Sequence, residues 1–113
     1  MAKLERVLKC DMYSLLHDID AGIRESISAS LEEETVEQIG SATVVMRVYE
    51  RYSYFGGNRV SLTVLAIKDG EKVRLSAVSS GGSQGIFLKF NTIGEKSFLS
   101  KLSQIVDTYQ QAN

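Results

Sequence analysis

Hydrophobic residues recur along the chain at two spacings, and these spacings divide it into strands and helices. Alternation of apolar and polar residues indicates a half-buried strand, whereas recurrence every three or four residues indicates an amphipathic helix. Alternation predicts strands at 3–10, 27–31, 42–49, 60–66, 73–79 and 86–90. We expect the acidic residues that follow the second of these segments, from Glu32 to Glu37, to solvate the end of that strand.

Helical spacing predicts two helices. The first has Asp11 as its N-cap and an apolar stripe from Met12 to Ile23. The second follows the capping-box spacing of Thr92 and Glu95 and has its own stripe, made of Phe98, Leu99, Leu102, Ile105, Val106 and Tyr109. The order of elements is therefore β-α-β-β-β-β-β-α. This order predicts one α+β domain over residues 1–113, an antiparallel sheet with both helices packed on one face.

The dipeptide Asp69-Gly70 predicts a tight hairpin between two of the strands. A two-residue type I′ turn there pairs each residue i with residue 139 minus i, so that Ala66 faces Val73 and Val64 faces Leu75. We expect Gly70 to have a positive φ. In the strand predicted at 42–49, the even positions Val44, Met46 and Val48 are assigned to the helix side. This assignment requires an odd-length loop or a bulge in the connection to the strand at 60–66, after Tyr54.

The side of the sheet away from the helices is unusually apolar in this assignment. It carries Val45, Tyr49, Leu65, Ile67, Val78 and Phe87, diluted by Arg47, Lys72, Arg74 and Lys89. An exposed apolar patch larger than a few hundred Å² is uncommon on a monomer and indicates a partner surface. Self-association is the simplest explanation, so we expect a homodimer through this face.

Composition removes several classes of function. The chain has 113 residues, a net charge of -1, one Cys and one His. One Cys and one His do not make an ordinary zinc site, and a Ser-His-Asp triad would need His17, which lies on a polar helix face. No metal or cofactor is expected. Without a basic cluster or a run of about 20 apolar residues, we expect no nucleic-acid or membrane partner and a cytoplasmic location.

A candidate ligand site lies where two glycine-rich loops are expected to share one rim of the sheet. Glu50 follows the even row of its strand, and the loops add Tyr52, Tyr54, Asn58, Arg59, Ser83 and Gln84. We expect these residues to converge around a small apolar or aromatic ligand, with Glu50 beneath them. The competing explanations are a solvated ion pair at a strand end and two hairpin turns that are merely neighbours.

The segment from Val48 to Leu62, together with Ser79-Ser80-Gly81-Gly82-Ser83-Gln84, resembles a family of small uncharacterised bacterial proteins, chiefly from Firmicutes, catalogued as a domain of unknown function. The resemblance spans the chain and implies a bacterial cytosolic protein without assigning an activity. At the level of fold, the order of elements resembles the TATA-binding-protein-like and helix-grip arrangements, which host many functions.

Three hypotheses follow. The first is a non-enzymatic module that binds a small ligand or a protein and acts as a homodimer. The alternative is a small enzyme or enzyme subunit that uses Glu50 with nearby tyrosines and Arg59. The third, a nucleic-acid-binding module, requires five cationic residues to gather on one surface, namely Arg47, Arg51, Arg59, Arg74 and Lys89.

Overall fold

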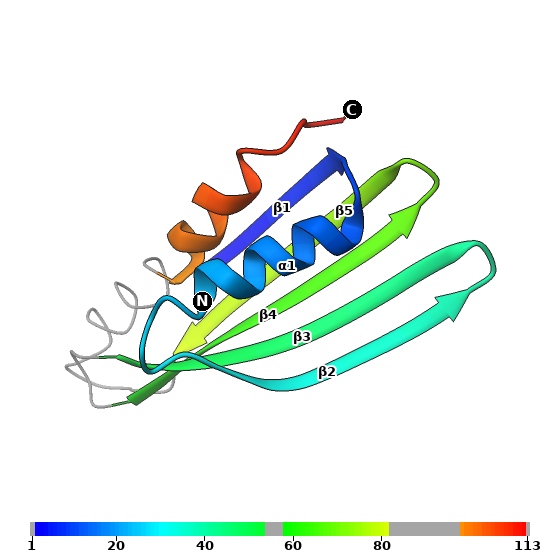
Figure 1. The fold of residues 1–113 in the computed structure, drawn as a ribbon. Coiled ribbons are helices and arrows are strands. Elements are labelled where there is room, and N and C mark those ends of the chain that lie inside the picture. The colour runs from blue at the N-terminus through cyan, green and yellow to red at the C-terminus, as the bar shows by residue number, and fades with distance from the viewer. Residues whose placement is uncertain (1, 54–57, 82–97, 113) are drawn as a thin grey trace.

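In the described part of the chain, five antiparallel strands form one sheet in the order β1-β5-β4-β3-β2 (Figure 1). The computed structural model describes residues 2–53, 58–81 and 98–112. Its elements are β1 (Ala2–Lys9), α1 (Met12–Ile23), β2 (Ser30–Ile39), β3 (Ala42–Ser53), β4 (Asn58–Asp69), β5 (Lys72–Gly81) and a helix over 98–106. Both helices lie on the same side of the sheet, which confirms the α+β class (Figure 1).

The helices cover one sheet face because their apolar stripes coincide with it. The Asp11 carboxylate accepts a hydrogen bond of 3.0 Å from the backbone N–H of Ser14 and starts α1 as predicted. The buried side chains of α1 and of helix 98–106 join those of the strands in one core. The helices also touch each other, since a Cβ on Gly22 would lie 2.3 Å from Cδ1 of Ile105. The predicted stripes are therefore correct for the described residues.

The chain end extends the sheet beyond β1. The backbone N–H of Lys9 donates to the carbonyl of Gln110 at 2.9 Å, and the N–H of Ala112 donates to the carbonyl of Val7 at 2.8 Å. These hydrogen bonds cover the edge of the sheet at β1. The opposite edge is formed by β2. That strand carries four glutamates, and charged side chains are a common protection of sheet edges against further pairing.

The β4–β5 hairpin has the predicted faces but a different register. Gly70 has the expected positive φ of 64°, yet Asp69 pairs with Lys72 and Ala66 pairs with Leu75. The predicted sum of 139 is wrong by two residues, because the turn residues are Gly70 and Glu71. A glycine with positive φ followed by a residue with negative φ is typical of a type II′ turn. A shift of two residues preserves the faces, so the same side chains remain buried.

Strand β2 is longer than predicted and begins later. Ile27, which was placed in a strand, is fully exposed before it, while Glu33, Glu34 and Glu37 lie within the pairing with β3. Because β2 is an edge strand with little buried surface, pairing with β3 determines its position and hydrophobic alternation does not. The prediction that the acidic residues only solvate a strand end is therefore wrong.

Strand β3 turns the opposite row of side chains toward the helices. The pairing with β4 runs without a break from Thr43 and Lys68 to Ser53 and Asn58, so Val45 pairs with Ala66 and Tyr49 with Leu62. The expected odd-length loop or bulge is therefore absent from this pairing, and the even row lies on the far side. The predicted strand 86–90 and the capping residues Thr92 and Glu95 lie outside the described residues.

Candidate functional site

The side of the sheet away from the helices is named the open face here. It carries the even positions of β3 and β5 and the odd positions of β1 and β4, because alternate residues of a strand point to opposite sides. In β2 it carries the odd positions from Glu33 onward, after the register shift between Leu31 and Glu33. Its centre is an apolar strip of partly exposed side chains: Val44, Met46, Val48, Leu65, Ile67 and Val78. Within the strip, Met46 pairs with Leu65 and Val44 with Ile67. No described segment of the chain covers this strip.

Three of the predicted interface residues lie on the open face and two do not. Leu65, Ile67 and Val78 are placed as predicted. Val45 and Tyr49 are only 3% and 0% exposed and belong to the core under the helices, so their predicted placement is wrong. The positions predicted for them are taken by Val44, Met46 and Val48. Phe87 and Lys89 lie outside the described residues.

The borders of the open face carry opposite charges. On one side, the charged residues at outward positions of β1 and β5 are Lys3, Glu5, Lys9, Lys72 and Arg74, with Lys3 paired to Glu5 and Lys9 to Glu71. On the other side, β2 contributes Glu33 and Glu37 and has no Lys or Arg along its length. The apolar strip thus lies between a mainly basic border and an acidic border.

A shallow hollow of about 660 Å³ opens near the basic border. Leu65 and Ile67 of the apolar strip contribute to its lining together with Arg74, and the chain end contributes Asp107 and Gln111. Asp107 accepts a hydrogen bond of 3.1 Å from Nε of Arg6, and bonds from Arg6 and Ser103 lower the pKa of its carboxyl. The hollow therefore combines apolar and charged groups at one end of the strip.

The predicted ligand residues meet in part. Nη1 of Arg59 lies 2.8 Å from Oε1 of Glu50, and its guanidinium carbon lies 5.7 Å from the centre of the Tyr52 ring. All three residues belong to the open face, whereas the sequence had placed Glu50 in the row under the helices. The carboxylate thus forms an ion pair at the surface, as in the competing explanation of an ion pair at a strand end, and does not lie in the core.

The remaining ligand residues are only partly described. Asn58 begins β4, where its backbone pairs with Ser53, while Tyr54, Ser83 and Gln84 lie outside the described residues. Val60 pairs with Gly81, so the chain leaves β3 and β5 at the same end of the sheet. This end is opposite the Gly70 turn. The convergence of the loops themselves stays a prediction.

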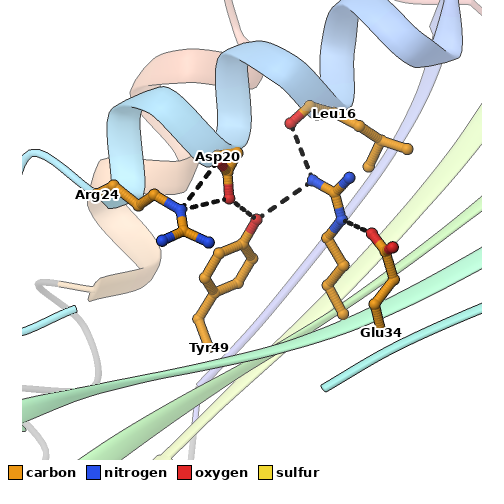
Figure 2. Close-up of polar contacts among 6 residues, drawn as sticks. Leu16, Asp20, Arg24, Glu34 and Tyr49 are labelled. Atoms are coloured by element: carbon orange, nitrogen blue, oxygen red, sulfur yellow. Dashed lines mark hydrogen bonds and ion pairs between the residues drawn. The ribbon is translucent and has the colours of Figure 1, made fainter. Parts of the chain in front are cut away.

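The helix side contains a polar network that the sequence did not indicate (Figure 2). Nε of Arg47 donates to Glu34 at 2.6 Å, and its Nη1 donates to the carbonyl of Leu16 at 3.2 Å and to the hydroxyl of Tyr49 at 3.3 Å. The Tyr49 hydroxyl donates in turn to Asp20 at 2.9 Å. The network joins β2, β3 and α1, and it supplies partners for an arginine and a tyrosine that lie in the helix-covered row.

The pKa shifts within this network have clear causes. Burial raises the pKa of Tyr49 to about 12, and the bond to Asp20 adds to this effect. Burial also acts to raise the pKa of Asp20, but hydrogen bonds from Arg24 and Tyr49 outweigh it and lower that pKa overall. At neutral pH the tyrosine is therefore a neutral donor to an ionised carboxylate. Tyr49 is fully buried, so this arrangement has a structural role and does not offer a reactive group.

A second hollow, of about 400 Å³, lies where the end of α1 approaches helix 98–106. The guanidinium carbon of Arg51 lies 4.4 Å from the centre of the Phe98 ring, and burial lowers the pKa of Arg51. Lys101 at the same hollow is neutralised by Glu25, with Nζ and Oε1 2.6 Å apart. The hollow thus combines one stacked cation with an ion pair.

The sequence contained one signal that would have identified the open face. When the loop between two antiparallel strands has an even number of residues, each odd-numbered residue of one strand pairs with an even-numbered residue of the other. The buried residues of β4 are the even-numbered ones. An even-length loop between β3 and β4 therefore places the odd-numbered residues of β3 under the helices. The observed connection of four residues has this parity. The residues missed by choosing the other parity are Val44, Met46 and Val48.

Within the part of the chain that the structure describes, no three His, Cys, Asp or Glu side chains are grouped so that they could hold a metal ion. The described helices are also too short or too polar to cross a bilayer. The side chain of His17 is 82% exposed. Burial raises the pKa of the Cys10 thiol, as expected for a half-buried cysteine.

The fold and its two unlike faces define a small α+β domain with a half-covered sheet. The chain matches the model of the family of unknown function DUF6054 over residues 1–110, and it belongs to this family. No curated protein and no solved structure matches it.

Proposed function

We propose that this protein is a non-enzymatic interaction module that acts as a homodimer through the open face of its sheet. The observation that carries the proposal is the contrast between the faces. Two helices cover one face, whereas the apolar strip of the other face has no cover among the described residues. A patch of this kind at the centre of a surface, bordered by charged residues, is typical of a protein interface.

The size of the open face fits a stable dimer. Five strands at a spacing of about 4.8 Å, each about ten residues long with a rise of about 3.3 Å, give a face of about 24 by 33 Å. This is about 800 Å² for each partner, the area that a specific protein interface buries. Two such sheets stacked about 10 Å apart would form a sandwich whose new core is the apolar strip.

The enzyme and nucleic-acid hypotheses have less support. Glu50, the proposed acid-base group, is paired with Arg59 at the surface. The cations that nucleic-acid binding would require are divided, since Arg47 and Arg51 lie in the row of β3 that faces the helices while Arg59 and Arg74 lie on the open face. A divided set does not make a continuous basic surface.

One observation favours a second candidate function, the binding of a small apolar or aromatic ligand on the same face. The hollow of about 660 Å³ includes Leu65 and Ile67 beside Arg74, a combination suited to an aromatic ring. Titration with indole should then shift the methyl resonances of Leu65 and Ile67. No shift at millimolar indole would remove this candidate.

We also propose a bacterial cytosolic location, as the family resemblance implies.

Substitution of a central residue of the apolar strip tests the dimer. Leu65→Lys places a charge in the middle of the interface and should give a folded monomer in sedimentation velocity at about 100 µM, where the wild type sediments as a dimer. Val36→Lys is the matched control, because Val36 is 58% exposed on a strand but belongs to the opposite row. Dissociation by both variants, or by neither, would contradict the proposal.

A further inference from the structure

We infer that the hollow of about 660 Å³ on the open face binds a small aromatic carboxylate, and that this ligand competes with the second copy of the chain. The inference rests on the proposed homodimer and on the second candidate function, and it adds the charge of the ligand and its effect on assembly. Two observations carry it. Leu65 and Ile67 belong both to the hollow and to the apolar strip, and one cation of the hollow, Arg74, is unpaired.

The shape of the hollow follows from the register of three strands. Two adjacent rows of the sheet form its floor, with Ile67, Arg74 and Val7 in one row and Leu65, Ser76 and Glu5 in the next. Gln111 and Ala112 of the chain end line its outer side, beyond β1. Ser76 has the smallest side chain of the floor, so the space lies above it, with the apolar strip on one side.

The charges that line the hollow leave one cation for a ligand. Nε of Arg6 lies 3.1 Å from Oδ1 of Asp107. Oε1 of Glu5 lies 2.8 Å from Nζ of Lys3. Arg74 is exposed and has no ion-pair partner among the described residues. Because a guanidinium binds a carboxylate through two parallel hydrogen bonds, the hollow favours an anion over a neutral ligand.

The spacing of this cation from the apolar side chains fits an aromatic acid. Ile67 pairs directly with Arg74, so their Cβ atoms are about 5 Å apart, and Leu65 lies on the diagonal at about 7 to 8 Å. A ring that lies on the two apolar side chains therefore presents a carboxylate on a short substituent to the guanidinium. The volume of about 660 Å³ is within the range of small-molecule sites.

The same two apolar residues link the ligand to assembly. When two sheets stack, the side chains of their inner faces interdigitate, so Leu65 and Ile67 would contact the second copy in the proposed dimer. A ring on these side chains occupies the space that the partner copy needs. Each copy must then release its ligand before the dimer forms, and the ligand favours the monomer.

Two indole derivatives of nearly the same shape test the class of ligand. Indole-3-acetate should bind about tenfold or more tightly than indole-3-acetamide, which lacks the charge, as measured by the methyl shifts of Leu65 and Ile67. Arg74→Gln should remove this preference. Arg59→Gln is the matched control, because Arg59 lies on the open face outside the hollow, and it should keep the preference. Equal binding of the two compounds by the wild type, or a preference that survives Arg74→Gln, would overturn the inference.

Sedimentation equilibrium tests the competition. At a concentration of indole-3-acetate about ten times its dissociation constant, the dimer dissociation constant should rise about a hundredfold, because two ligands must leave for each dimer formed. Val48→Lys charges the apolar strip outside the hollow, opposite Glu33, and should give a folded monomer. At about 100 µM protein this variant should bind indole-3-acetate more tightly than the wild type, since no dimer competes.

The outcomes separate this inference from the proposed homodimer. A dimeric wild type that binds indole-3-acetate with no change in its dimer dissociation constant, or with a tighter dimer, would overturn the competition and leave the homodimer standing. No binding at millimolar indole-3-acetate would overturn the inference in the same way. A wild type that is monomeric at every concentration without ligand would overturn the homodimer itself. Binding that requires Arg74 and weakens the dimer is the result expected.

Discussion

The two faces of the sheet are formed by the same strands, but their charged side chains differ in burial and in the number of hydrogen-bond partners. On the helix side, Arg47 is only 17% exposed at its side chain and donates to Glu34, Leu16 and Tyr49. On the open side, Arg59 is 57% exposed at its side chain, pairs with Glu50 and lies over the ring of Tyr52. A buried cation requires several partners, whereas a surface cation can exchange its partner for water.

This difference shows which face the fold needs. The helix side contains the core and a network that joins three elements, so its residues determine the stability of the monomer. The open side adds apolar side chains that the isolated chain buries only in part. Such residues contribute less to folding than those of the core, and the apolar surface that they leave exposed is explained by association.

Truncation of one leucine on each face of β4 should give the largest contrast. Leu62 is fully buried, and Leu62→Ala should lower the free energy of unfolding by about 3 kcal/mol through lost burial and a cavity. Leu65→Ala on the open face should lower it by about 1 kcal/mol or less. Urea unfolding at low micromolar concentration measures both. Equal effects would mean that the faces do not differ in the monomer.

Removal of the Tyr49 hydroxyl tests the network at alkaline pH. Because the pKa of Tyr49 is raised to about 12, its neutral form is favoured in the folded state, and this stabilisation is complete below pH 10 and lost as pH rises toward 12. The shift corresponds to about 2 to 3 kcal/mol. Tyr49→Phe should lose this part of the pH dependence and about 1 to 2 kcal/mol at pH 7.

The control for this experiment is Tyr52→Phe, on the open side of the same strand, where the ring is 57% exposed. Its unfolding free energy should follow that of the wild type across the pH range. Thermal or urea unfolding between pH 7 and 11.5 gives the comparison. If Tyr49→Phe keeps the full alkaline loss of stability, the network does not hold the proton on Tyr49.

The smallest effect is expected for the ion pair on the open face. Arg59→Ala removes a pair whose partners are 57% and 32% exposed at their side chains, and such pairs contribute about 0 to 1 kcal/mol. Arg47→Ala, by contrast, leaves the Tyr49 hydroxyl and the Leu16 carbonyl without a donor and should cost about 2 kcal/mol or more. Melting temperatures of the two variants provide the test. A larger loss for Arg59→Ala would reverse the assignment of the two sides.

Local sequence signals predicted those elements in which burial on the helix side fixes the spacing of the apolar residues. The N-cap at Asp11, the stripe of α1 and the faces of the β4–β5 hairpin all follow from spacing that the helix side enforces. The hairpin register was missed by two residues because Gly70 occupies the first turn position. The local dipeptide Asp69-Gly70 does not distinguish this turn from the predicted one.

The faces of β3 were not predictable from that strand alone. Val44, Val45 and Met46 are apolar on both sides, so alternation gives no preference, and the parity of the connection to β4 decides which row is buried. For the same reason the candidate interface was only partly correct. The Glu50–Arg59 pair was predictable because the two residues lie near the ends of adjoining strands, whereas the Arg47 network depends on contacts with a distant helix.

Methyl resonances observed by NMR over a dilution series test most directly whether the open face is the surface that associates. The proposal predicts that resonances of Val44, Met46, Leu65 and Ile67 shift between about 10 µM and 1 mM, while those of buried Leu15, Ile19 and Val64 do not. Shifts confined to exposed side chains outside the open face, such as Ile27 or Val36, would contradict it. So would spectra that do not change with concentration for a protein that sediments at its monomer mass of 12.5 kDa.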